Sequence, residues 1–229
     1  MEYKFVGSED EMTPLYIPYV NRIDLLVRAY ESAKGQGAEI GIIDNSPKRE
    51  IAKIGNAWTI TPATPLTFSA TQNFMLKMAT EGMSPFYLFM HSDAEAGPLS
   101  VHRLIQIADT LTKENRKWGV VWTAYDALAA FNTEAFNDVG GWDEELEWYH
   151  SDTDIYRRLK LANYEMIESS LPVHHEPSQT LKSDPNIAAQ VDRMVPFREA
   201  YYRAKWGGDS GHETFVIPFN GVIIDRSSV

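Results

Sequence analysis

The stretch Phe86-Tyr-Leu-Phe-Met-His-Ser-Asp-Ala-Glu95 decides the fold class of this 229-residue chain. Its first five residues are apolar without a polar break, which is typical of a short β-strand buried on both faces. Polar residues begin at His91, and Asp93 and Glu95 follow. Open α/β sheets bind ligands at the carboxyl ends of their strands. We therefore predict that Asp93, helped by Glu95 or His91, holds a metal ion that binds a nucleotide diphosphate. The alternative is that the two carboxylates only cap a helix starting near Pro98.

Composition narrows the class of protein. The chain is 44% hydrophobic and 23% charged, which is ordinary for a globular protein, and its net charge is −11. This charge disfavours a broad nucleic-acid-binding surface. The absence of cysteine excludes disulfides and thiolate metal sites and fits a reducing compartment. We expect a cytoplasmic protein, because no signal peptide and no transmembrane stretch of about 20 apolar residues is visible.

Strand and helix patterns alternate along the first half of the chain. Strands at 13–20 and 38–43 flank a helix at 23–33, which predicts a βαβ unit with parallel strands. The remaining elements expected in this half are strands at 58–61, 86–90 and 119–123 and helices at 69–80 and 99–113. This alternation predicts a single α/β domain with a mostly parallel central sheet and helices on both faces.

The second half changes character after a strand expected at 127–132. Beyond it we expect a helix at 133–139, a break at Gly140 and Gly141, a helix at 151–162, a strand at 164–167, an extended segment at 171–178 and a helix at 187–205. The apolar tail, 215–225, is expected to pack back on the domain.

Between about residues 13 and 178, these motifs resemble the family 2 glycosyltransferases of the GT-A fold. The opening strand ends in a turn similar to the family's Pro-x-x-Asn. Ile42-Ile-Asp-Asn-Ser46 is similar to the family's Val-Asp-Asn-x-Ser, whose aspartate contacts the donor base, and Ser69-Ala-Thr-Gln-Asn73 resembles its Ala-Arg-Asn segment. Gln72 stands where many members have arginine. The resemblance implies that the residues binding the sugar donor are Pro18, Tyr19, Asn21, Asp44, Gln72, Asn73, Ser92 and Asp93.

The family's metal motif, Asp-x-Asp, has two possible registers here. One reads His91-Ser92-Asp93 and the other Asp93-Ala94-Glu95, so Asp93 is a ligand in both. A late histidine often completes the family's site, and we expect one ligand, not two, from the adjacent pair His174 and His175, because neighbours in an extended segment point to opposite faces. The implied cofactor is Mn²⁺ or Mg²⁺, and an imidazole ligand suits Mn²⁺ better. The implied metal ligands are Asp93, Glu95, His174 and His175.

Two later motifs resemble the family's acceptor side. Gly140-Gly-Trp-Asp-Glu144 is similar to Gly-Gly-Phe-Asp-Glu, and Ser151-Asp-Thr-Asp154 is similar to Glu-Asp-x-Asp, whose second residue is the catalytic base. That role falls on Asp152, for which a helix cap is the alternative. Asp154 is expected to support its helix rather than the chemistry. The implied acceptor-binding residues are Gly141, Trp142, Asp143, Glu144, Trp148 and Tyr149, although Trp142 fits a core position equally well.

The resemblance thus implies a metal-dependent, inverting glycosyltransferase. It would move a sugar from a nucleotide-diphosphate sugar, most simply a UDP-sugar, to a hydroxyl of a glycan or another acceptor. Residues 13–125 would form the donor half and 126–229 the acceptor half of one domain. One alternative is a nucleotidyltransferase, although the turn after the first strand lacks a glycine-rich basic loop. Another is a binding domain without turnover, which the residues His91, Gln72 and Ser151 favour. The sequence leaves the sugar, the acceptor, the pathway and the oligomeric state open.

Overall fold

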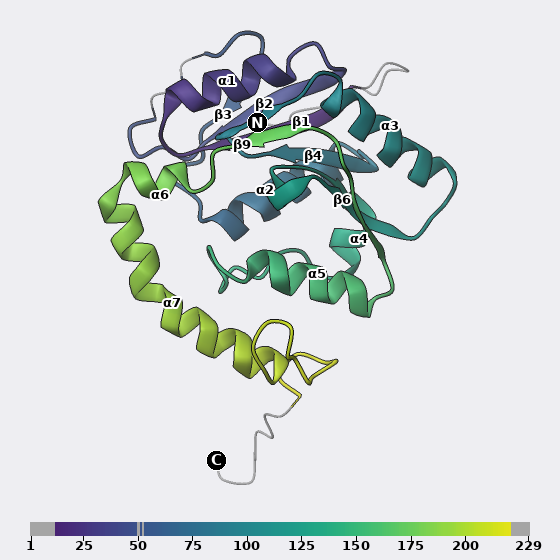
Figure 1. The fold of residues 1–229 in the computed structure, drawn as a ribbon, viewed down its shortest axis with the longest axis vertical. Helices are drawn as coiled ribbons and strands as arrows, with labels where there is room; N and C mark the ends of the chain where they lie inside the picture. The colour runs from purple at the N-terminus through teal and green to yellow at the C-terminus, as the bar shows by residue number, and fades with distance from the viewer. Residues whose placement is uncertain (1–11, 50, 52, 221–229) are drawn as a thin grey trace.

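The computed structural model describes residues 12–49, 51 and 53–220, and a seven-stranded sheet lies at its centre (Figure 1). The strand order is β3-β2-β1-β4-β7-β6-β8, and every strand is parallel to the others except β7. The strands are β1 (Thr13–Tyr19), β2 (Ala38–Asp44), β3 (Trp58–Ile60), β4 (Phe86–Met90), β6 (Trp118–Trp122), β7 (Leu128–Asn132) and β8 (Glu165–Glu168). The prediction of a mostly parallel sheet is confirmed.

Helices cover both faces of this sheet, as the alternating pattern predicted. One hydrophobic cluster joins the sheet to α1 (Ile23–Ala33) and α3 (Ser100–Lys113). A second cluster, on the other face, joins it to α2 (Phe68–Glu81), α4 (Thr133–Asp138) and α5 (Ser151–Leu161). All five residues of β4 are buried, because β1 and β7 flank the strand and both faces are covered. The chain therefore forms a single α/β domain.

A second, two-stranded antiparallel sheet was not expected from the sequence. It pairs β5 (Ala94–Ala96) with β9 (Val173–His175), so that Ala94 lies opposite His175 and Glu95 opposite His174. This small sheet brings the polar end of β4 next to a segment that is about eighty positions later in the chain.

The chain then continues through α6 (Gln179–Ser183) into the long helix α7 (Pro185–Trp206), which runs away from the sheet (Figure 1). The C-terminal end of α7 packs Tyr202 and Trp206 against Leu146. The amide groups of Phe215 and Phe219 donate hydrogen bonds to the last turn of α7. The rest of the expected tail, 221–225, lies outside the described residues. Among the helices in the described part of the chain, none is long and apolar enough to cross a membrane.

Candidate active site

The polar ends of two strands lie at one edge of the sheet. Asp44 ends β2, and Asp93 follows β4 by three residues; both strands are parallel to β1, which lies between them. Asp44 and Asp93 therefore lie at the same edge of the sheet, on strands that are separated by β1. Asp44 is 1% exposed, and its carboxylate accepts hydrogen bonds from the amides of Ser46 (2.9 Å) and Ile51 (3.2 Å). Asp44 thus shapes the loop that follows β2.

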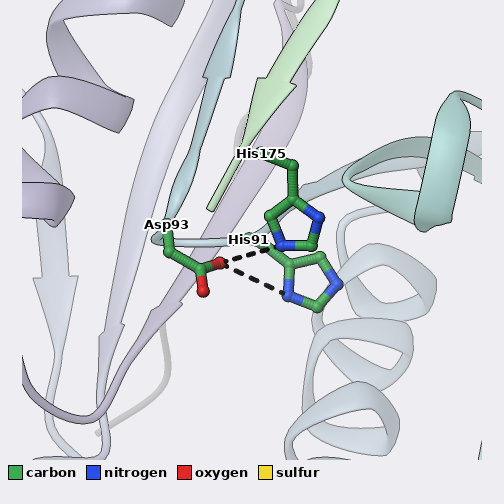
Figure 2. A group of neighbouring side chains, drawn as sticks. All are labelled: His91, Asp93 and His175. Carbon is green, nitrogen blue, oxygen red and sulfur yellow. Dashed lines mark hydrogen bonds and ion pairs between the residues drawn. The ribbon is translucent and has the colours of Figure 1, made fainter. Parts of the chain in front are cut away.

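Three side chains meet beyond the end of β4 (Figure 2). The His175 Nε2 atom lies 3.2 Å from Asp93 Oδ1, and His91 Nδ1 lies 4.0 Å from the same oxygen. The two imidazole rings are 5.1 Å apart, and the three possible ligand atoms all lie within 4.8 Å of one another. Two imidazoles and one carboxylate form a donor set that suits a borderline divalent cation such as Mn²⁺ better than Mg²⁺. The residues therefore fit a metal of the implied kind.

The electrostatics of the His91–Asp93–His175 group keep the carboxylate charged and one imidazole neutral. Burial lowers the pKa of His91 to about 4, against the opposing effect of Asp93 and Asp152. Burial also acts to raise the pKa of Asp93, but the hydrogen bond to His175, the electrostatic contributions of His91 and His175 and the hydrogen bond from the Gln179 amide together bring this pKa below its ordinary value. A neutral imidazole and an ionised carboxylate are the forms that bind metal ions.

Two residues proposed from the sequence as ligands lie on the other face of the β5–β9 pair. Glu95 and His174 form a separate group with Glu176, and Arg28 makes ion pairs with both glutamates, the one to Glu176 being 2.8 Å long. The physical reason is the alternation of side chains along a strand: His175 points to Asp93, so His174 points away. The structure thus separates Glu95 and His174 from the His91–Asp93–His175 group.

The turn after β1 is tied to α6. Asn21 Nδ2 donates to the carbonyl of Thr180 (3.1 Å), and Arg22 Nη1 donates to Gln179 Oε1 (3.2 Å). The amide of Gln179 in turn donates to Asp93 Oδ2 (3.2 Å). Three other candidate donor residues are nearby in the fold: Pro18 and Tyr19 end β1, and Ser92 lies in the turn between β4 and β5.

The two candidates on α2 differ. Asn73 holds the segment after α4, because its amide bonds to both the N–H and the C=O of Trp142 (2.7 and 2.9 Å) and to Glu144 (2.8 Å). This network explains Asn73 without a ligand. Gln72 is fully buried, and neither atom of its amide has a hydrogen-bond partner among the described residues.

Most of the Gly-Gly-Trp-Asp-Glu segment serves the architecture. Trp142 is 4% exposed and packs edge-on against Phe68 at a ring distance of 5.7 Å, so the core alternative fits it. Asp143 bonds to Lys205 (2.5 Å) and to the hydroxyl of Tyr201 (2.9 Å), both on α7. Gly141 is buried with φ +70°, a value that favours glycine. Of the other acceptor candidates, Tyr149 is 44% exposed and Trp148 is half-buried.

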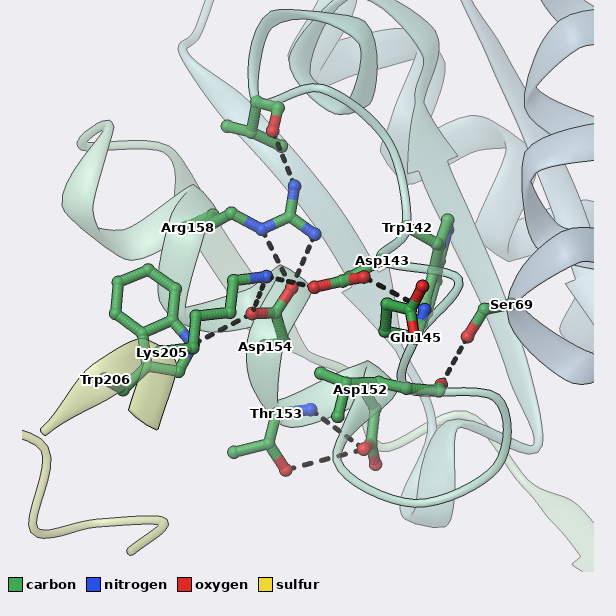
Figure 3. Close-up of polar contacts among 12 residues, drawn as sticks. Ser69, Trp142, Asp143, Glu145, Asp152, Thr153, Asp154, Arg158, Lys205 and Trp206 are labelled. Atoms are coloured by element: carbon green, nitrogen blue, oxygen red, sulfur yellow. Dashed lines mark hydrogen bonds and ion pairs between the residues drawn. The ribbon is translucent and has the colours of Figure 1, made fainter. Parts of the chain in front are cut away.

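Two carboxylates of α5 face different surroundings (Figure 3). Asp154 is fully buried and accepts hydrogen bonds from Arg158 (2.6 Å) and the Trp206 indole (2.8 Å), and it pairs with Lys205 (2.7 Å). Asp152 is exposed, and its Oδ1 accepts from the amide of Thr153 (2.8 Å). The surroundings of Asp154 fit a supporting role, whereas Asp152 remains open to solvent.

Three residues that the sequence did not single out lie around the candidate site: Asp126 and Tyr156, on which the charge of Asp152 acts, and Tyr125, which lies near His175. The Tyr156 hydroxyl donates to Asp126 Oδ2 (2.8 Å). Tyr125 precedes Asp126, and its ring is 6.4 Å from that of His175. Only the spacing of Asp152 and Tyr156, one helical turn apart, was available in the sequence as a signal.

No protein-family model and no curated protein sequence matches the chain. Among solved structures, residues 1–349 of S. aureus TarS match with a TM-score of 0.51 and 15% identity, over 70% of this chain and 58% of that chain. A longer S. aureus TarS structure gives 0.51 and 12% identity, over 70% of this chain and 35% of that one. CMP:2-keto-3-deoxy-manno-octonic acid synthetase complexed with CTP matches with a TM-score of 0.48 and 12% identity, over 79% of this chain and 100% of that chain. The chain thus spans little more than half of TarS 1–349. The likeness to TarS concerns the fold, which is the GT-A, or nucleotide-diphospho-sugar transferase-like, fold.

Proposed function

We propose that the chain is a metal-dependent, inverting glycosyltransferase similar to family 2, which moves a sugar from a UDP-sugar or related donor to an acceptor hydroxyl. The observation that carries this proposal is the His91–Asp93–His175 group at the carboxyl edge of a GT-A sheet. Open α/β sheets bind their ligands at this edge. The electrostatic effect of Asp152 on His91 indicates that a second carboxylate lies close to the group.

The three side chains would hold a divalent cation through His91 Nδ1, one Asp93 oxygen and His175 Nε2. Such a cation, when bound, neutralises the negative charge that develops on a leaving diphosphate. Asp93 Oδ2 meanwhile keeps its hydrogen bond to the Gln179 amide, which orients the carboxylate. On α2, Gln72 is the donor candidate whose amide has no hydrogen-bond partner among the described residues, but it is fully buried, so a contact with the donor would require its side chain to become accessible.

Asp152 would act as the base that removes the proton from the acceptor hydroxyl. The residue is exposed and lies in the first turn of α5, so its carboxylate is accessible to an acceptor. Inversion by direct displacement needs only this one base. Trp148 and Tyr149, just before α5, stay candidates for contact with the acceptor.

Thermal unfolding with MnCl₂, UDP and UDP-sugars tests this proposal, because a ligand that binds only the folded state raises the midpoint. The wild type should show a Mn²⁺-dependent rise with UDP or a UDP-sugar. Asp93→Ala should abolish it. Glu95→Ala, which alters the opposite face of the same small sheet, should keep it. Loss of the effect in Glu95→Ala and its retention in Asp93→Ala would refute the proposed ligand set.

The same screen, followed by an assay of sugar release, separates the two other functions. Binding of CTP or another nucleoside triphosphate in preference to every nucleotide sugar would indicate a nucleotidyltransferase. Binding of a nucleotide sugar without transfer or hydrolysis, with Mn²⁺ present, would indicate a binding domain without turnover.

A further inference from the structure

The turn η1 (Ala124–Asp126), between β6 and β7, has a strained backbone. Tyr125 (φ 58°, ψ 27°) and Asp126 (φ 51°) are consecutive left-handed residues, and neither is glycine. The left-handed region is unfavourable for residues that carry a Cβ atom. Thr123, which is fully buried, clamps the turn: its carbonyl accepts from the Asp126 amide and its hydroxyl from the Leu128 amide, both at 3.0 Å. Strain held in place by surrounding contacts is typical of functional sites.

The strained turn presents an aromatic ring to solvent at the edge of the candidate site. Tyr125 is 84% exposed, the highest value among the large hydrophobic side chains of the described residues. Its ring nevertheless lies 6.4 Å from the His175 ring, tilted by 50°. The ring is therefore placed beside the His91–Asp93–His175 group but takes no part in the hydrophobic core.

Asp126 adds a carboxylate next to this ring. Its Oδ2 accepts from the Tyr156 hydroxyl, and Tyr156 is itself fixed by stacking on Trp122 at 5.6 Å. Burial, with the charges of Asp152 and Glu168, raises the pKa of Asp126 to about 6 despite the Tyr156 hydrogen bond. No donor among the described residues bonds to Oδ1 of Asp126. Asp126 thus offers an acceptor on the side of the site where Asp152 lies.

We propose that η1 is a subsite for a pyranose ring, in which Tyr125 stacks on the apolar face of the sugar and Asp126 accepts a hydrogen bond from one of its hydroxyls. A pyranose carries C–H groups on its faces and hydroxyls on its rim, so an exposed ring beside a fixed carboxylate is complementary to it. This inference rests on the proposed function, which supplies two sources of such a ring: the acceptor and the donor. The proximity to Asp152 favours the acceptor.

Two variants test the subsite without unfolding the protein. Tyr125→Gly removes the ring and also relieves the left-handed strain, so its thermal midpoint should equal or exceed that of the wild type. Tyr125→Phe keeps the ring and should keep binding. Phe197→Ala is the matched control, because Phe197 is a 69%-exposed aromatic residue on α7.

The probes are the para-nitrophenyl derivatives of glucose, galactose and N-acetylglucosamine. Their binding is measured by saturation-transfer NMR, with para-nitrophenol as the control for the aglycone. A second arm compares the affinities of UDP and UDP-glucose by calorimetry with Mn²⁺. We expect Tyr125→Gly to weaken sugar binding about tenfold, which corresponds to one stacking contact of about 1.4 kcal/mol.

The arms separate the outcomes. Loss of glycoside binding alone assigns an acceptor sugar, and loss of only the advantage of UDP-glucose over UDP assigns a donor sugar. If wild type and Tyr125→Gly bind sugars equally, or if the wild type binds no sugar in either arm, the subsite is refuted. If UDP still binds in that case, the proposed transferase stands without the subsite. If glycosides bind through Tyr125 but no nucleotide binds, the subsite stands and the transferase fails.

Discussion

Asp152 and Asp154 lie two positions apart on α5 and differ in burial. This difference suits Asp154 to a structural role and Asp152 to contact with a substrate. Asp154 is fully buried and surrounded by three cationic or N–H donors, whereas Asp152 is exposed and bonds only to the next residue among those described. A fully paired, buried carboxylate cannot approach a substrate. An exposed carboxylate at the start of a helix can approach one.

Asp152→Asn should therefore lower kcat by about 10²–10⁴-fold with little change in donor binding. Asparagine keeps the shape and the oxygen that accepts from the Thr153 amide, so the start of α5 should persist. The measurement is the rate of sugar transfer alongside the Mn²⁺-dependent thermal shift. Transfer at the wild-type rate would show that Asp152 is a cap, and the exposed Glu144 would be tested next as the base.

Asp126 makes the free energy of unfolding depend on pH, with the opposite sign to the effect of an ordinary paired aspartate. Burial comes first among the causes that raise its pKa from 3.8 to about 6, so the folded state holds the proton more tightly than the unfolded state. The stability due to this proton is complete below the unfolded pKa and is lost as pH rises to about 6.

Asp126→Asn removes this loss, because a neutral amide can still accept the Tyr156 hydrogen bond. Its free energy of unfolding, relative to wild type, should rise between pH 4 and 6 by at most about 3 kcal/mol and then stay level. Urea unfolding of both proteins at pH 4.5, 6 and 7.5 measures this. If the difference in unfolding free energy between the two proteins is the same at all three pH values, the pKa of Asp126 is not raised in the folded state.

At the scale of elements, the contact of α5 with α7 depends on buried charge. Lys205 pairs with Asp154 (2.7 Å) and Asp143 (2.5 Å), and the indole of Trp206 bonds to Asp154 (Figure 3). Removing one partner of a buried pair leaves the other charge uncompensated, which costs more than the net contribution of the pair.

Asp154→Ala should accordingly reduce the free energy of unfolding by about 3–5 kcal/mol. It should also make the C-terminal half of α7 more sensitive to limited proteolysis. Glu199→Ala is the control, since it removes only an exposed 3.3 Å ion pair with Arg203 and should cost less than about 1 kcal/mol. Equal effects of the two substitutions on chemical unfolding would contradict this account of the contact.

Sequence patterns predicted the elements whose hydrophobic periodicity is strong, among them α1 at its observed bounds and the buried strand β4. They missed β5, which has three residues and forms only because β9 pairs with it. Such pairing over a long sequence separation leaves no periodic signal. The direction of β7 was likewise not evident, because a strand pattern is the same in both directions.

The part of the candidate site that depends on Asp93 could be predicted from the sequence. The choice between His91 and Glu95 as its neighbour could not, because it depends on how β5 pairs with β9. Asp93 was chosen because it fits both registers of the metal motif. His91 lies beside Asp93 and Glu95 does not, because the β5–β9 pairing turns Glu95 toward Arg28. Asp126 and Tyr125 had no motif at all, because a strained turn reveals itself only through backbone angles.

At the scale of the whole molecule, the candidate site links the start and the end of the sheet domain. Glu176 donates its amide to the Asp93 carbonyl (3.0 Å), and Gln179 donates its amide to the Asp93 carboxylate (3.2 Å). Arg22, at the start of α1, reaches Gln179 from the other side. Any ligand that stabilises Asp93 in its observed position should therefore also stabilise α6, which leads into α7.

Hydrogen exchange with and without MnCl₂ and UDP tests this coupling. At a hundred times its dissociation constant, a ligand specific to the folded state contributes about 2.7 kcal/mol, so amides that exchange by opening of the site should slow about a hundredfold. We expect this at Glu176 and Gln179. Amides at the exposed C-terminal end of α3 should not change, because they exchange by local fraying. Asp93→Ala should abolish the difference at both sites, and slowing of α3 to the same extent as α6 would show a global effect instead of a coupled one.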